Sequence, residues 1–430
     1  MILRLKPPMS VRILHFADAH IDIANYGRHD PETGLPYRVE DFLKSLDQIV
    51  DTAIEERVDL VIFAGDAYKD RNPQPTFQRA WGERMMRLSR AGLPTLLLIG
   101  NHDVGPAEYR AHTLQEYSTL AVPHIFVADT IKLWGPEELG APVQVLTLPW
   151  VTRSRFLARN DTAGKTSEEI NQIILDRIGK SFAETLATKI DPKLPLILTA
   201  HASIGGATYG SERLVMLGRD MVIGKVLVTD PHFDYVALGH IHKHQMVNER
   251  PPVVYSGSIE RIDFGEWREK KGFVLADVSR GHTEWRFIEL DTRPFHDRLI
   301  RLEEADGFME KLVSLLPESH EVVGAICRLR LEYPHELDAL LDEKIIRDRY
   351  ADAFDLRIIK NRTGTQQAKL GALLAMESLG PYELLQHYWR SRNQTDAEIE
   401  ELLTLAGDVL AIHSPTGKIS PENPVAGTSL

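Results

Sequence analysis

Five short polar motifs, each directly after an apolar run, constrain the fold of this chain more than any other feature of its sequence. These motifs are Asp18-Ala-His20, Gly65-Asp66, Gly100-Asn-His-Asp103, Ala200-His201 and Gly239-His-Ile-His242. Short apolar runs of this kind are typical of buried β-strands. In α/β folds, ligands bind at the edge of the sheet where such strands end. The motifs therefore predict an α/β sheet with polar side chains collected along one edge.

Strands and helices are expected to alternate through the first part of the chain. Apolar residues spaced as on one face of a helix predict a helix over residues 39–56. The predicted strands cover residues 11–17, 59–64, 94–99, 143–148, 194–200, 235–238, 252–255, 272–278 and 283–290.

The length of 430 residues predicts more than one domain, because one hydrophobic core rarely serves so long a chain. The alternating pattern occupies residues 1–290. Residues 291–362 are typical of a small, separate α+β domain. Residues 363–412 predict a linker followed by two helices. The tail, residues 413–430, is rich in Pro, Gly and Ser and is expected to be disordered.

Within the later part of the chain, local patterns predict individual elements. In the small domain a helix is expected at residues 307–316, between strands at residues 297–302, 325–333 and 355–360. Of the terminal helices, the first begins at Pro381 in its first turn, and Thr395 or Asp396 caps the second, residues 397–412.

The charge and cysteine content limit the classes of protein. A net charge of −12 argues against a chain that coats nucleic acid over its whole surface. It does not exclude a nucleic-acid enzyme, because carboxylates that hold cations contribute to that charge. The single cysteine, Cys327, fits a reducing compartment. Since no membrane span or signal peptide is recognisable, we expect a cytoplasmic protein.

The five motifs supply donors that suit two divalent cations. Carboxylates, imidazoles and an amide favour Mn, Fe, Zn or Mg. Two such ions activate water for attack at phosphorus, which explains the lack of a Ser or Cys nucleophile in the set. His102, beside a ligand, is expected to donate a proton to the leaving oxygen or to stabilise the transition state. The predicted ligands are Asp18, His20, Asp66, Asn101, His201, His240 and His242.

Most of the 17 histidines are expected to have no part in this site. His244 is close to the last motif and could touch substrate, although exposure to solvent is the simpler expectation. Those interpreted as core or surface residues include His15, His29, His112, His124, His232 and His282.

The order of the motifs resembles that of the calcineurin-like metallophosphoesterases. Later segments are similar to the SbcD branch of that family, the nuclease subunits of the SbcCD double-strand-break complex. The chain departs from some members of the family at Lys69, three residues after Asp66, where those members have histidine. This difference limits the transfer of their exonuclease mechanism to this chain. The segments similar to the SbcD branch are residues 237–243, 254–265, 271–273 and 293–295.

The resemblance implies a fold and two sets of ligands. The fold would be a four-layer sandwich of two mixed sheets flanked by helices, with a small capping domain and a C-terminal helix-loop-helix. The ions would be Mn by this resemblance, and one of them would be held by Asp18, His20, Asp66 and His242. The second would be held by Asp66, Asn101, His201 and His240, with Asp66 bridging.

Further residues receive roles from the same resemblance. His102 would be the catalytic histidine, and Asp103 would orient an imidazole. Ser256, Ser258 and Arg261 would lie beside the DNA backbone.

The resemblance also implies partners. Helices at residues 75–90 and 107–120 would form a homodimer, with Phe77, Trp81, Met85 and Leu88 on one stripe; alternatively, this stripe packs on its own sheet. The terminal helices would grip the coiled coil of an SbcC-like ATPase, or fold back on their own domain. No Gly-x-x-x-x-Gly-Lys-Ser/Thr loop is present, so another chain would handle ATP.

Three functions are compatible with these motifs. The first is a two-metal DNA exonuclease and endonuclease, a hydrolase of DNA repair and recombination. The alternative is a phosphatase or cyclic-nucleotide phosphodiesterase for small substrates, against which stand residues 255–261 and the long segment after Leu290. The third is a scaffolding subunit without activity, whose sign would be a broken motif, and none is broken here.

Overall fold

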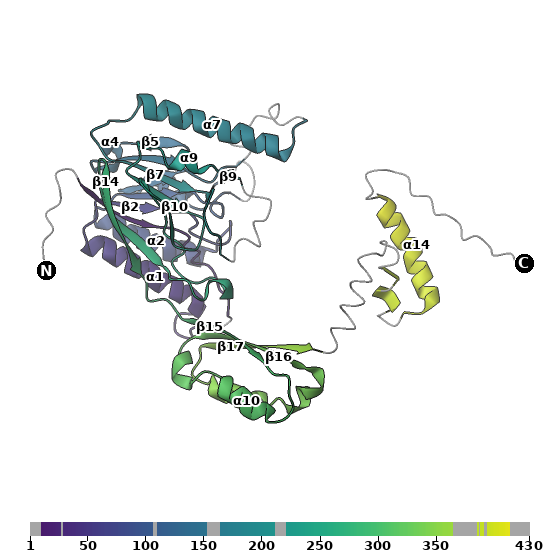
Figure 1. Ribbon diagram of the computed structural model, residues 1–430. Coiled ribbons are helices and arrows are strands. Elements are labelled where there is room, and N and C mark those ends of the chain that lie inside the picture. Colours follow the sequence, from purple (N-terminus) through teal and green to yellow (C-terminus); the bar gives the residue numbers. More distant parts are fainter. Residues whose placement is uncertain are drawn as a thin grey trace, which may run out of the picture. The chain divides into compact units, whose positions relative to one another are not determined.

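A computed structural model describes residues 10–26, 29–105, 110–152, 164–210, 221–363, 385–386, 388–390 and 394–412 (Figure 1). Its contacts divide the chain into two compact units. The first comprises Met1–Arg298 with Pro317–Leu329 and Arg347–Arg357, and the second holds the remainder. The predicted domain boundaries stay predictions.

Two six-stranded mixed sheets form the first unit. One has the order β14-β13-β1-β2-β3-β4 and the other the order β11-β12-β10-β7-β6-β5. In the first sheet β1 to β4 run parallel up to the edge strand β4, and the antiparallel pairings with β13 and β14 lie on the other side. In the second sheet the four central strands run parallel, and an antiparallel strand lies at each edge. The strands of the first sheet are β1 Val11–Phe16, β2 Leu60–Phe63, β3 Thr95–Leu98, β4 Ile125–Ala128, β13 Gly272–Ser279 and β14 His282–Glu289. Those of the second are β5 Lys132–Trp134, β6 Gln144–Leu148, β7 Leu196–His201, β10 Tyr235–Gly239, β11 Gln245–Glu249 and β12 Pro252–Tyr255.

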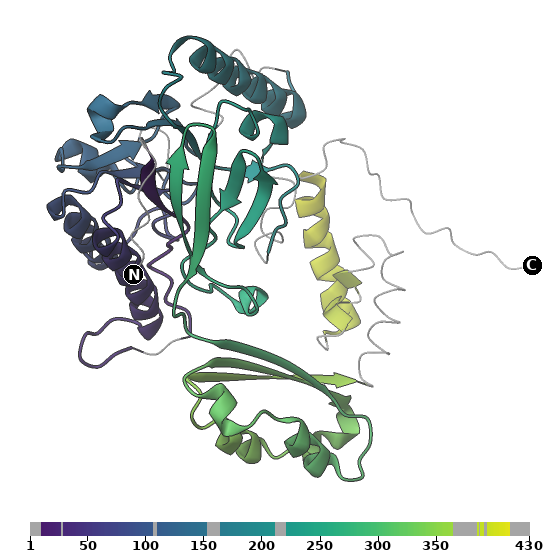
Figure 2. The same cartoon turned by 60° about the vertical axis from the view of Figure 1, so that its left-hand side comes forward.

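Alternation of side chains along the strands separates three apolar layers. Figures 1 and 2 show the two sheets and the helices that cover them. In β1, Ile13 belongs to the core shared with Ile197 of the second sheet, whereas Leu14 belongs to a core with helix residues on the other face. Leu198 faces the third core, with α7. Successive side chains of a strand point to opposite faces, so each sheet is buried on both sides. The predicted four-layer sandwich is thereby confirmed.

Helices form the outer layers of the sandwich. Helices α1 and α2 contribute to the core of the first sheet, and α7 contributes to that of the second. The helices of this unit are α1 Tyr37–Glu55, α2 Pro75–Arg90, α3 Gln115–Thr119, α4 Pro136–Leu139, α7 Ser167–Thr188, α9 Lys225–Val228, and the 3₁₀ turns η1 Phe264–Glu266 and η2 Ser319–Val322. A two-stranded ladder joins β8 Ser203–Ile204 and β9 Val222–Ile223.

The apolar stripe of α2 is part of the core of its own unit. Trp81 and Met85 are fully buried, and Trp81 packs against Phe63 of β2 at 4.9 Å between ring centroids. The alternative in which this stripe packs on its own sheet therefore describes the structure. These side chains are not left for a dimer contact.

Replacing Trp81 by alanine is expected to lower the free energy of unfolding by about 3–5 kcal/mol, because a large buried ring leaves a cavity. Chemical denaturation of the purified protein measures this loss. Replacing the exposed Leu120 by alanine serves as the control and should change stability little.

The second predicted dimer helix, over residues 107–120, is wrong in its described part, where only α3, Gln115–Thr119, is helical. The reason is a side-chain contact. The carbonyl oxygen of Asp103 accepts the Thr113 amide at 2.9 Å, and its carboxylate accepts the Thr113 hydroxyl at 3.1 Å. These bonds hold the chain in a turn ahead of α3.

A three-stranded sheet, β15-β16-β17, follows the sandwich in sequence. The elements of this region are β15 Phe295–Arg301, α10 Phe308–Leu315, β16 Ile326–Pro334, η3 His335–Leu340, α11 Glu343–Arg349 and β17 Asp355–Thr363. The predicted strands and the helix at 307–316 are confirmed within one or two residues at most ends, although β17 runs three residues further.

The last described helix, α14, covers Asp396–Ile412 and confirms the second terminal helix. The Thr395 hydroxyl accepts the Glu398 amide at 3.4 Å, and the Glu398 carboxylate accepts the Thr395 amide at 2.8 Å. This reciprocal pair is a capping box, so Thr395 is the cap. Most of the first terminal helix and the tail after residue 412 lie outside the described residues. In the described part of the chain, no helix is sufficiently long and apolar to span a bilayer.

Candidate metal centre

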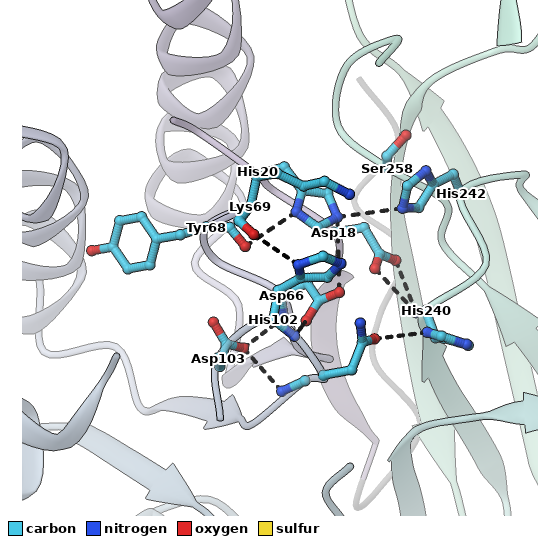
Figure 3. A network of polar contacts seen from close by, with 12 residues as sticks. Asp18, His20, Asp66, Tyr68, Lys69, His102, Asp103, His240, His242 and Ser258 are labelled. Carbon is cyan, nitrogen blue, oxygen red and sulfur yellow. Dashed lines mark hydrogen bonds and ion pairs between the residues drawn. The ribbon is translucent and has the colours of Figure 1, made fainter. Parts of the chain in front are cut away.

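Five strands deliver the predicted ligands to one edge of the sandwich. Asp18 and His20 follow β1, Asp66 follows β2, and Asn101 follows β3. In the second sheet His201 ends β7, and the last motif follows β10. Strands β1, β2 and β3 are parallel, and so are β7 and β10, so their carboxyl ends meet at the same edge. The structure brings all seven predicted ligands together. Figure 3 labels five of them, Asp18, His20, Asp66, His240 and His242.

The backbone at these strand ends has conformations that non-glycine residues rarely adopt. The φ angles are 51° at Asp18, 40° at His20, 66° at Asp66 and 98° at His240. Each costs of order 1–3 kcal/mol and persists because the surrounding fold holds it. Such strain is concentrated at functional sites, and here it turns four predicted ligands out of the strand direction.

Glycines in two of the motifs allow the site to close. A Cβ atom at Gly100 would lie 2.2 Å from Oδ1 of Asp66, and one at Gly65 would lie 2.3 Å from Nδ1 of His201. No side chain can be accommodated at either distance. The glycine before each ligand therefore permits the close approach of the next strand end.

The donor atoms converge in two groups, each with its atoms within 4.8 Å of one another. The first contains Asp18, His20 and His242, and the second contains Asp18, Asp66 and His201. Oδ1 of Asn101 lies 2.9 Å from Nε2 of His201. It also lies 2.9 Å from Nδ1 of His240, which adds these two residues to the second group.

Asp66 belongs to the second group and also lies close to the first. Its Oδ2 is 3.3 Å from Nε2 of His201 and 3.8 Å from Nε2 of His20. Burial disfavours its charge, but the surrounding imidazoles, His201 first, hold the pKa of this carboxyl well below its ordinary value. Burial also disfavours charge on His201, yet Asp66 and Asp18 raise its pKa to about 9. Asp66 is thus placed to serve both groups.

Hydrogen bonds on Nδ1 leave the Nε2 atoms of three imidazoles facing the site. Nδ1 of His20 lies 3.2 Å from the Tyr68 carbonyl oxygen, and Nδ1 of His201 lies 2.7 Å from that of Ala64. Nδ1 of His242 lies 2.9 Å from the Glu266 carboxylate. Acceptors at Nδ1 select the tautomer whose Nε2 lone pair is open to a metal.

His102 lies at the margin of the site, where its ring is 5.1 Å from that of His20 (Figure 3). Its Nδ1 donates to the Lys69 carbonyl oxygen at 2.7 Å, and its amide donates to Oδ1 of Asp66 at 2.8 Å. Burial lowers the pKa of His102. The imidazole also lines a cavity of about 1030 Å³, together with Lys69, Arg71 and His29.

Asp103 has partners other than the expected imidazole. Its carboxylate accepts the amides of Asp66 at 2.7 Å, Ala67 at 3.0 Å and Gly100 at 2.9 Å, in addition to the Thr113 hydroxyl. It therefore joins the loops after β2 and β3. Asp103 positions Asp66 through the backbone.

The three residues predicted to contact substrate have contacts within the protein. Ser256 and Ser258 are fully buried, and their hydroxyls donate to the carbonyl oxygens of Gly257 and Glu260. The Arg261 guanidinium donates to the Thr292 hydroxyl and to the carbonyl oxygens of Arg293 and Glu269. Their role toward substrate stays a prediction.

Other histidines are part of the core. His15 is buried between the Tyr235 hydroxyl, 3.1 Å from Nδ1, and the Leu238 carbonyl oxygen, 3.2 Å from Nε2, as expected of a core residue. His244 is not the solvent-exposed residue expected, because its ring stacks on Phe287 at 3.9 Å between centroids. The stack and a bond from Nδ1 to the Tyr255 carbonyl oxygen hold it against the sheet.

Three residues near the ligands are absent from the sequence predictions. Trp150 lies with its ring 4.9 Å from that of His240. Glu266 and Lys271 are buried behind His242. Lys271 carries a weak sequence signal, since it opens one of the segments similar to the SbcD branch. The sequence contains no such signal for Trp150 or Glu266, because each contacts a predicted ligand that is distant from it in sequence.

The arrangement fits two divalent ions. Asp18, His20 and His242 would hold one and Asn101, His201 and His240 the other, with Asp66 between them. Oxygen and imidazole donors without thiolate suit hard or borderline ions. Nε2 of His20 and Nε2 of His242 lie 3.3 Å apart, each with an acceptor at Nδ1, so two lone pairs face each other as ligands of one cation would.

Comparisons with known proteins agree with this geometry. The calcineurin-like phosphoesterase family matches residues 11–244, a span that contains all five motifs. The DNA double-strand break repair protein Mre11 of Archaeoglobus fulgidus is 22% identical over 365 residues, which cover 81% of this chain and 75% of that protein.

Two solved structures are also similar. The crystal structure of TT1561 of Thermus thermophilus has 18% identity and a TM-score of 0.37, and the match covers 65% of this chain and 99% of that one. A dimetal phosphatase from Danio rerio has 11% identity and a TM-score of 0.37, with coverage of 64% and 98%. Because the family match spans more than half of the sequence and includes every strand end that carries a ligand, this chain belongs to the calcineurin-like phosphoesterase family.

Proposed function

We propose that this metallophosphoesterase is a two-metal-dependent DNA exonuclease and endonuclease, the nuclease subunit of an SbcCD-like repair complex. The likeness to the archaeal double-strand break repair protein carries the proposal. It extends over 365 residues, whereas the family match ends at residue 244, so it includes segments beyond the metal motifs. Similarity limited to the catalytic core, which phosphatases share, would not continue beyond the metal motifs.

The surroundings of His102 support a polymeric substrate. The cavity beside it has the cationic side chains of Lys69 and Arg71 on its wall, together with the carboxylates of Asp22 and Asp70. Lys69 and Arg71 are exposed, so their charges are open to phosphates despite the net charge of −12. Local positive charge of this kind contacts a nucleic-acid backbone without regard to sequence.

The side chains around the ions have distinct tasks in this proposal. Two divalent ions would supply the activation of water and the neutralisation of phosphate charge. Asp66 and Asn101 hold and orient the donor set, and Asp103 fixes the loops that carry them. His102 gives or takes a proton at Nε2, because its Nδ1–H is engaged by the Lys69 carbonyl oxygen.

The proposed complex also needs a partner that hydrolyses ATP. Helix α14, with a capped first turn, is proposed to bind the coiled coil of such an ATPase. The side of α2 away from its buried stripe, with the segment around α3, is proposed to contact a second copy. Exposed Leu405 of α14 supports the first contact. Deleting residues 381–430 should abolish co-purification with a coiled-coil ATPase and leave the nuclease activity of the isolated chain in place.

Duplex DNA is expected to be degraded in the presence of Mn²⁺ and to survive in EDTA. The reason is that the predicted site contains no Ser or Cys nucleophile, so cleavage depends on water that the ions activate. Labelled linear duplex and single-stranded DNA, separated on denaturing gels, measure this activity. p-Nitrophenyl phosphate and bis-p-nitrophenyl phosphate serve as small substrates. Intact DNA together with rapid turnover of these esters would replace the proposal by a small-molecule phosphatase. Fewer than two bound ions with no turnover of either substrate class would indicate a scaffolding subunit.

A further inference from the structure

A buried acid and a buried base lie behind His242. Glu266 ends the turn η1, and Lys271 begins the segment that leads into β13; each is 1% exposed. Charged side chains are almost never fully buried unless they are paired. The sequence predictions assign neither residue a role.

Glu266 connects His242 to Lys271 through its two carboxylate oxygens. Oε1 lies 2.9 Å from Nδ1 of His242, and Oε2 lies 2.9 Å from Nζ of Lys271. Oε2 also accepts the Ile262 amide at 3.0 Å. Both oxygens of the buried carboxylate therefore have partners, with the imidazole on one side and the ammonium on the other.

Lys271 holds the backbone of the same histidine. Its ammonium donates to the His242 carbonyl oxygen at 3.0 Å and to Oε2 of Glu269 at 2.9 Å, in addition to Glu266. Three acceptors match the three donors of an ammonium group. His242 is thus held at its ring by Glu266 and at its carbonyl by Lys271, while Nε2 faces the site.

His242 differs in this respect from His20 and His201, whose Nδ1 atoms meet backbone carbonyl oxygens. A carboxylate at Nδ1 fixes the ring and makes Nε2 a stronger ligand than a carbonyl does. We propose that Glu266 and Lys271 are positioning residues that fix the tautomer and orientation of His242, and thereby set the affinity of one of the two metal ions. This inference rests on the two-metal site of the proposed function but not on its substrate.

The segment after β12, which was predicted to contact substrate, also makes bonds that support His242. The Ser258 amide donates to the His242 carbonyl oxygen at 3.0 Å, and Arg261 holds the Glu269 carbonyl oxygen at 2.8 Å. The first bond holds His242 itself, and the second holds the loop that follows Glu266. Residues 256–271 therefore support a metal ligand from behind.

Calorimetric titration of the EDTA-treated full-length protein with Mn²⁺ tests the proposal. Glu266→Gln keeps the shape but removes the charge, and it places an amide donor against the Lys271 ammonium or the imidazole N–H. One of the two ions is expected to bind about 10–100-fold more weakly, the usual effect of losing such a partner. The other ion should keep its affinity. Glu289→Gln is the matched control, because Glu289 pairs with Lys270 at 2.7 Å at the surface, far in sequence from any ligand.

Thermal unfolding in EDTA separates a positioning role from a structural one. A folded Glu266→Gln variant that binds both ions as tightly as the unchanged protein would overturn the proposal. Equal weakening of both ions together with a lower unfolding midpoint in EDTA would also overturn it, because the pair would then support the fold alone.

Glu266→Gln could fail to fold, since it leaves the Lys271 charge buried. The double variant Glu266→Gln/Lys271→Met removes both charges and gives the same test, with the same selective weakening expected. Failure of the double variant to fold would contradict the proposal. Two tightly bound ions without cleavage of DNA in the unchanged protein would contradict the proposed function but not this inference. The absence of any bound ion would contradict both.

Discussion

Alanine in place of His102 is expected to lower the rate of Mn²⁺-dependent DNA cleavage by about 10²–10⁴-fold, the usual contribution of a positioned acid or base. The two ions should still bind, because His102 lies outside both groups of donor atoms. Its imidazole bonds to the Lys69 carbonyl oxygen and faces the cavity. Cleavage of labelled duplex and calorimetric titration with Mn²⁺ measure the two quantities.

His282→Ala provides the control for this change. His282 is a surface residue of β14, and its removal should alter neither quantity. A His102→Ala variant that cleaves DNA at the unchanged rate would remove His102 from the mechanism. Loss of metal binding in the same variant would make His102 a ligand.

Replacing Asp66 by asparagine is expected to weaken the binding of both ions by more than about 100-fold, because loss of a ligand exceeds the 10–100-fold effect of losing its hydrogen-bond partner. Asp66 is 1% exposed and lies between His20 and His201. Asparagine has the same shape, so the His102 amide keeps its acceptor. DNA cleavage should fall with the occupancy of the site. Metal analysis after gel filtration gives the number of ions retained.

The matched control is Asp51→Asn, which removes a carboxylate that pairs with Arg87 at the surface. It should retain two ions and full activity. Two ions bound by Asp66→Asn with nearly unchanged affinity would show that Asp66 does not bridge them. Loss of one ion alone would assign Asp66 to a single group.

The central strands were predictable because they are continuous apolar runs. Strands β1, β2, β3, β7 and β10 are buried throughout or nearly so, and each ends at a polar motif. The edge strand β11 has no buried residue, and β5 has one. Strands at the margin of a sheet bury less and leave a weaker pattern, so neither is among the predicted elements.

Helix α7 is also missing from the predicted elements, although its sequence contains a signal. Ile170, Ile174, Ile178 and Phe182 recur at four-residue spacing, and all four are buried. The opposite error occurred at residues 107–120. The family resemblance implied a helix there, but the hydrogen bonds that Thr113 donates to Asp103 decided the backbone of the described part.

The amino-acid sequence by itself determined which side chains are donors and at which strand ends they lie, because apolar periodicity and motif order are local properties. Only the tertiary structure decided that Asp66 lies between two groups of imidazoles, that Asp103 ties two loops together, and that Glu266 holds His242 from behind. These contacts join strand ends from two sheets and a loop 24 residues beyond the last motif. Their distances depend on how the sheets pack and how far each loop reaches, and no local pattern contains that information.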